Sequence, residues 1–255
     1  MSEELLKALM QLFAIVAKED GITSAEEKVI ESFLRLQLNE DSVVEYMTLL
    51  KQYAEETERS GKVKDEEQKI KARSRDSTRT LRICMKINKE LTQKQKIVIM
   101  VRLFELIAAD GVITGQEEEY VKTFADIFNI EKEEFEAIRE YVLNSEIFNK
   151  SIYNVDQESI LVIDNKENGL AKAKKGTKKR KHLYVENLSG NIAVLRIPSV
   201  ESYMVRYNGD NDIYLNGVAL NQNQISVFAT GSSIRSPKIY PIYYSDIISR
   251  FLSDD

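Results

Sequence analysis

One stretch of this chain occurs twice, and the two copies are related by an offset of 91 positions. FAIVAKEDGITSAEE begins at Phe13, and FELIAADGVITGQEEE begins at Phe104. Self-similarity within a chain marks a structural unit that is used more than once. The matching pairs are Phe13 and Phe104, Ala17 and Ala108, Ile22 and Ile113, Thr23 and Thr114, Glu26 and Glu117, and Phe33 and Phe124.

Each copy predicts a corner between two helices. The first helix ends at Asp-Gly, because glycine tolerates the left-handed conformation that a helix end requires. An isoleucine, Ile22 or Ile113, is expected to return into the core between the helices. Thr23 or Thr114 then begins the second helix as its N-cap, with a glutamate three residues later completing a capping box. Capping alone therefore accounts for most of the repeated residues.

A divalent cation is the alternative interpretation of the same loops. Two loops that each carry a carboxylate before a helix N-terminus could converge about a pseudo-twofold axis and share a cation through hard oxygen ligands. Neither loop is an EF-hand: the third and fifth positions are Ile22 and Ser24 counted from Asp20, and Val112 and Thr114 counted from Asp110. Helix capping and cation binding both stay open.

Composition divides the chain into two parts and excludes several classes of site. Residues 1–150 carry a net charge of 23 − 30 = −7, no proline and almost continuous helical periodicity, whereas residues 151–255 carry 13 − 11 = +2 and all three prolines. The predicted fold is therefore α + β in separate domains, with about seven helices in residues 1–149 and a small antiparallel sandwich or barrel in residues 150–255. One cysteine and one histidine exclude an intramolecular disulfide and a Cys-cluster zinc site, and argue against a Ser/His/Asp hydrolase.

The pattern A-x-x-D-G-x-[IV]-[ST]-x-x-E, present twice in an all-α domain, resembles the TerB-like family associated with tellurite resistance. The resemblance covers roughly residues 1–148 and implies a bundle of about seven helices with an acidic, metal-associated face. No cofactor is certain, and a divalent metal ion is the one that the resemblance suggests. The first copy departs from the pattern, because its Asp lies one residue short. The candidate ligands carried over are Glu19, Asp20 and Glu26 from the first copy, and Asp110 and Glu117 from the second.

The second part contains seven short runs rich in β-branched and aromatic residues, separated by turn dipeptides such as Asn216-Gly217. A basic run holds seven Lys or Arg between residues 172 and 181. It has two interpretations, a phosphate-rich partner or a solvated hairpin tip that protects a strand edge, and the second is favoured. His182 is expected to open a strand. The predicted strands are 160–164, 182–188, 191–197, 202–207, 212–217, 224–229 and 238–244, followed by a helix over 245–252.

Residues 210–235 resemble the closing half of a forkhead-associated domain, because Asn216-Gly217, Phe228, Gly231 and Ile234 match its turn and strand pattern. The phosphate-reading Gly-Arg and Ser-x-x-His elements of that family are not found. Ser232, Ser233 and Arg235 remain candidates for phosphate or partner binding, since arginine matches phosphate geometry.

The domain order resembles the N-terminal region of certain ABC-transporter-type ATPases, and the chain contains no G-x-x-x-x-G-K-[ST] phosphate loop. We therefore expect a fragment without catalysis of its own, a regulatory and interaction region that responds to a divalent metal. Its expected partner is a protein or the downstream ATPase domain, with no nucleic acid and with a membrane contacted only through a transporter. Its expected location is the cytoplasm, at the cytoplasmic face of the inner membrane. The alternatives are a free-standing TerB-like metal-sensing stress protein and, less favoured, an enzyme that uses paired carboxylates.

Overall fold

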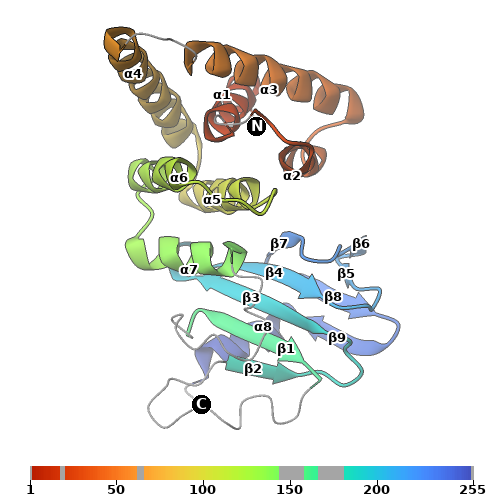
Figure 1. The fold of residues 1–255 in the computed structure, drawn as a ribbon. Helices are drawn as coiled ribbons and strands as arrows, with labels where there is room; N and C mark the ends of the chain where they lie inside the picture. The colour runs from red at the N-terminus through yellow and green to blue at the C-terminus, as the bar shows by residue number, and fades with distance from the viewer. Residues whose placement is uncertain (1, 18–20, 62–65, 144–157, 166–180, 254–255) are drawn as a thin grey trace. The chain divides into compact units, whose positions relative to one another are not determined.

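The computed structural model describes residues 2–17, 21–61, 66–143, 158–165 and 181–253, with the side chains of residues 57–76 left out of the description. The chain forms two compact units, residues 1–135 and 136–255 (Figure 1). The predicted α + β class in separate domains is confirmed. The division lies inside a helix, whereas the boundary expected at residues 149–150 lies outside the described residues.

The first unit is built from helices, as predicted. The charged region 59–80 is shared between the end of one helix and most of the next. α1 packs against α3, α4, α5 and α6, which explains why its side chains are buried on nearly every side. The helices are α1 (Glu3–Val16), α2 (Ser24–Arg35), α3 (Glu40–Gly61), α4 (Glu66–Glu90), α5 (Gln93–Ile107), α6 (Gly115–Ile127) and α7 (Lys132–Leu143), the last of which crosses the division.

The repeated phenylalanines lie in the core of this unit. Phe13 and Phe104 are each 1% exposed, and their partners Phe33 and Phe124 are also buried. Phe13 packs edge-on against Phe33, with ring centroids 5.9 Å apart. Cys84 is fully buried, and burial raises the pKa of its thiol to about 12. Cys84 therefore acts as a small hydrophobic residue of the core.

The second unit contains two sheets. Sheet A has the order β2-β1-β3-β4-β7 and sheet B the order β6-β5-β8-β9. The pairing is antiparallel except between β1 and β2, which run parallel. The strands are β1 (Ile160–Asp164), β2 (Lys181–Tyr184), β3 (Asn191–Ile197), β4 (Ser202–Asn208), β5 (Tyr214–Leu215), β6 (Val218–Ala219), β7 (Ile225–Phe228), β8 (Ser233–Ser236) and β9 (Ile239–Tyr243), with a short 3₁₀ turn at Pro198–Val200 and a closing helix α8 (Tyr244–Leu252).

Each predicted strand overlaps an observed strand, but several of the bounds differ. β1 and β3 have the predicted bounds, whereas β2 is shorter than predicted and β6 and β8 were missed. The core of this unit lies between the sheets and under α8, where Val205 of sheet A, Ile234 of sheet B and Phe251 of α8 belong to one buried cluster. Side chains alternate between the faces of a strand. Ala193, Leu195 and Met204 therefore lie on the other face of sheet A, and all three are buried.

Candidate functional site

Both repeated loops end in the predicted capping boxes. The Thr23 hydroxyl accepts a hydrogen bond from the Glu26 N–H at 3.2 Å, and the Thr23 N–H donates to Glu26 Oε2 at 2.7 Å. The second copy repeats both distances with Thr114 and Glu117. Gly21 and Gly111 have positive φ angles of 77° and 81°. The preceding helices end earlier than predicted, at Val16 and Ile107 and not at the Asp-Gly pairs. The predicted N-caps and capping boxes are confirmed for both copies.

Charges of the second loop act on a carboxylate of the first. Glu26 is only 5% exposed. Burial raises the pKa of the Glu26 carboxyl, and the negative charges of Asp110 and Glu117 raise that pKa further, although the hydrogen bonds from Thr23 oppose the shift. Glu26 belongs to the first copy and both other acids belong to the second, and the convergence of the two copies on one site stays a prediction. Glu19 and Asp20 lie outside the described residues.

The chemistry of these three acids suits a hard cation. Each capping glutamate accepts a backbone N–H through its Oε2, and carboxylate oxygens are what Ca²⁺ and Mg²⁺ bind. A cation would also offset the cost of a buried carboxylate beside two like charges. Among the residues that the structure describes, no group of three or more His, Cys, Asp or Glu is already arranged to hold a metal ion.

The tip of the second loop differs from prediction. Ile113 is 37% exposed, so the expectation that it returns into the core is wrong, and Ile22 is only half-buried. Asp110 is exposed and its Oδ1 accepts a hydrogen bond from the Val112 N–H at 2.9 Å. This bond turns the loop at Asp110, which leaves Val112 66% exposed and the isoleucine short of the core.

The raised pKa of Glu26 predicts how the cation-free protein responds to pH. A folded-state pKa above the unfolded value of 4.5 means that the folded state holds this proton more tightly. The contribution of Glu26 to stability is therefore complete below pH 4.5 and lost as the pH rises through the folded-state pKa. We expect Glu26→Gln, which keeps an oxygen acceptor for Thr23, to raise the melting temperature at neutral pH by a few degrees in chelator.

Circular dichroism melts from pH 4.5 to neutral pH in EDTA measure this effect. Glu27→Gln is the matched control, because Glu27 is the next residue of α2 and its carboxylate pairs with Lys51 at 3.0 Å. The control removes an ion pair and not a buried carboxylate, so it should not raise the melting temperature at neutral pH. Equal pH profiles for wild type and Glu26→Gln would show that this carboxyl is not the titrating group.

Ser232, Ser233 and Arg235 lie together beside the Asn216-Gly217 turn. The Asn216 side-chain amide donates to the Ser232 hydroxyl at 3.0 Å and accepts from the Ser233 N–H at 3.0 Å. Arg235 donates through Nε to the Ser233 hydroxyl at 3.2 Å and is otherwise exposed. Ser232 is 4% exposed, so its hydroxyl serves to brace the β5–β6 turn against β8. Phosphate binding by these residues stays a prediction.

The sequence did not predict two contacts that residues at the start of β2 make. His182 is the second residue of this strand, which begins at Lys181, and its Nε2 lies 2.9 Å from Asp164 Oδ1 on β1. Lys181 donates through Nζ to the carbonyls of Phe251 and Ser253 at 2.9 and 2.8 Å. The last lysine of the basic run therefore caps the C-terminus of α8. The rest of that run lies outside the described residues.

Comparison with known proteins places the first unit in a family. Neither a curated protein nor a solved structure gives a match to this chain. In the described part of the chain, no helix is both long and apolar enough to cross a membrane. The family model of the tellurite resistance protein TerB matches residues 6–140, which is more than half of the chain and includes both acidic loops. The chain therefore belongs to the TerB family.

Proposed function

We propose that this chain is a non-catalytic regulatory module that responds to a divalent cation through its two acidic loops. Glu26, Asp110 and Glu117 would hold the cation, together with Glu19 and Asp20 from the first loop. The bound cation would neutralise the repulsion between these carboxylates and fix the two helix corners relative to one another. The observation that carries this proposal is the buried Glu26, whose pKa is raised in part by two acids of the other copy.

The second unit supplies the docking role in this proposal. Its sheets and its closing helix form a separate core. The order of a TerB domain and a forkhead-associated-like domain is the reason for proposing an ABC-transporter-type ATPase as the partner, at the cytoplasmic face of a membrane. The alternative function, a free-standing metal-sensing protein, would use the same cation site and would need no such partner.

Titration calorimetry of metal-stripped protein with Ca²⁺, Mg²⁺, Mn²⁺ and Zn²⁺ tests the cation site. We expect at least one ion to bind, and Asp110→Asn to weaken that binding by roughly tenfold or more, because it removes one charged ligand. Asp126→Asn is the matched control, since it removes the same charge at the far, exposed end of α6. Absence of binding to wild type, or equal losses in both variants, would contradict the proposal.

A further inference from the structure

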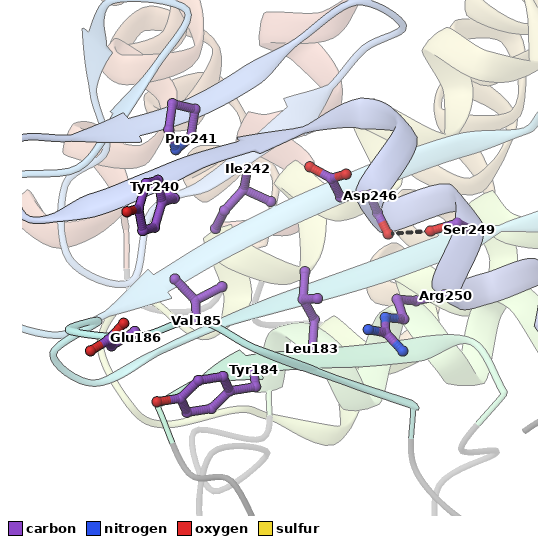
Figure 2. Close-up of a pocket in the computed structure, with 10 residues that line it drawn as sticks. All are labelled: Leu183, Tyr184, Val185, Glu186, Tyr240, Pro241, Ile242, Asp246, Ser249 and Arg250. Atoms are coloured by element: carbon purple, nitrogen blue, oxygen red, sulfur yellow. Dashed lines mark hydrogen bonds between the residues drawn. The ribbon is translucent and has the colours of Figure 1, made fainter.

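The two sheets of the second unit leave a groove on one side. It has a volume of about 390 Å³ and lies between β2, which is one edge of sheet A, and β9, which is one edge of sheet B. Leu183 and Val185 face Ile242 across this groove (Figure 2). An edge strand presents main-chain groups with which another strand can pair. The accessible edge of each strand therefore decides what the groove can bind.

The edge of β9 is already closed to a further strand. Ile242 pairs with Ile234, and the Tyr244 N–H donates to Ser232 O at 3.1 Å, so the even-numbered residues face β8. Pro241 and Tyr243 face outward. Proline has no N–H to donate, and the Tyr243 N–H donates to Asp246 Oδ2 at 2.8 Å. Both outward donors of β9 are thus removed.

The edge of β2 is open at Tyr184. The Val185 N–H donates to Asp164 O at 2.8 Å, and Tyr184 is the register partner of Asp164. In a parallel ladder these two facts turn the main-chain groups of Leu183 and Val185 toward β1 and those of Tyr184 outward. Among the described residues, no hydrogen bond is recorded from the Tyr184 N–H. One edge of the groove is thus protected, and the other presents a donor and an acceptor that no described residue uses.

The surroundings of the groove define the chemistry of a partner strand. Side chains that point inward from a strand added to β2 would meet Leu183, Val185 and Ile242, so they should be apolar at alternate positions. Glu186 and Arg250 stand at opposite ends of the groove (Figure 2). A partner strand with a basic residue near Glu186 and an acidic residue near Arg250 would complement the charges of the groove. Tyr240, which is 83% exposed, provides an aromatic wall.

We propose that β2 and this groove bind an extended segment of a partner protein by strand addition, with apolar residues at alternate positions and opposite charges at its two ends. This inference deepens the docking role proposed above and is independent of the cation site. The partner strand would pair with the Tyr184 main chain and continue sheet A. A peptide that binds while the cation titration fails would separate the two proposals.

A phage-displayed library of random dodecapeptides, selected on the full chain, supplies the probe. We expect enriched peptides with alternating apolar residues, and we measure the affinity of the synthetic forms by fluorescence anisotropy. Tyr184→Pro removes the outward N–H, and we expect it to weaken binding by about tenfold or more. Tyr184→Ala keeps that N–H and should retain affinity within about threefold, which separates main-chain pairing from loss of the tyrosine ring.

Arg250→Glu tests the end of the groove that selects an acidic residue. It should weaken peptides that carry the acid and should spare versions in which that acid is replaced by lysine. Circular dichroism and exchange of β3 amides check that each variant is folded. If no peptide is enriched over a selection without protein, or if the enriched peptides bind wild type and Tyr184→Pro equally, the proposal is overturned.

Discussion

Gly190→Ala is expected to destabilise the second unit by about 3 kcal/mol or more. Gly190 has a φ of 76°, a conformation that side chains rarely adopt. A Cβ at this position would lie 2.0 Å from the Asn208 carbonyl oxygen and 2.6 Å from the Gly209 Cα. Because both obstacles are backbone atoms, relief requires the loop between β2 and β3 to separate from the loop after β4.

Tyr207 joins the same two loops. Its hydroxyl donates to the Ser189 carbonyl at 3.0 Å and accepts from the Asn211 N–H at 2.6 Å. Tyr207 is almost fully buried, and burial raises the pKa of its phenol, so this hydroxyl stays protonated and can bridge both partners. Moving the loops apart would break this bridge as well as the close backbone contact, which is why the expected loss exceeds that of an ordinary glycine substitution.

Gly217→Ala is the matched control for Gly190→Ala. Gly217 has a similar φ of 84°, and a Cβ there would meet nothing within 4 Å. It is expected to cost about 1 kcal/mol, from backbone strain alone. Urea unfolding followed by near-ultraviolet circular dichroism of the tyrosines measures both losses. Equal losses would show that strain, and not the approach of the two loops, determines the effect at Gly190.

The features that sequence reasoning predicted well are local ones. Thr23, Thr114 and their glutamates lie three residues apart, so a capping box follows from one turn of helix geometry. The duplication also predicts that the two loops converge on one site; Asp110 and Glu117 raise the pKa of Glu26, and the convergence itself stays a prediction. The exposure of Ile113 depends on the hydrogen bond from the Val112 N–H to Asp110 within its loop, and residue spacing does not reveal that bond.

The features that were missed depend on distant partners. The parallel pairing of β1 with β2 and the contact of Asp164 with His182 join residues on either side of a long connection. Strands as short as β6 hold two residues, too few for an alternating pattern. The sequence predicted a helix in this region but not which element would bury the side chains of α7. Tyr141 illustrates this, because its partners lie on β3 and β4.

Tyr141→Ala is expected to destabilise the second unit by about 3–5 kcal/mol, although it lies in the last of the predicted bundle helices. Tyr141 is fully buried, and its hydroxyl donates to the carbonyl of Ala193 at 2.9 Å, with the Met204 carbonyl at 3.3 Å. Arg206 places its guanidinium 5.1 Å from the centre of the Tyr141 ring and donates to the Val142 carbonyl at 3.3 Å. The C-terminal half of α7 is thus held to sheet A by the ring and hydroxyl of Tyr141 and by the carbonyl of Val142.

Hydrogen exchange measured by mass spectrometry on the full chain locates the effect. Tyr141→Ala should speed exchange in β3 and β4, because it removes the side chain that contacts both strands. It should leave α1 and α5 protected. Phe124→Ala, which truncates an equally buried ring of α6, should do the reverse. The Tyr141 hydroxyl contributes about 1 kcal/mol of this effect, which Tyr141→Phe measures separately.

If both alanine variants speed exchange throughout the chain, the two units unfold together and α7 belongs to neither alone. If the variants separate as expected, α7 from Glu136 onward folds with the β unit, although the TerB match extends to residue 140.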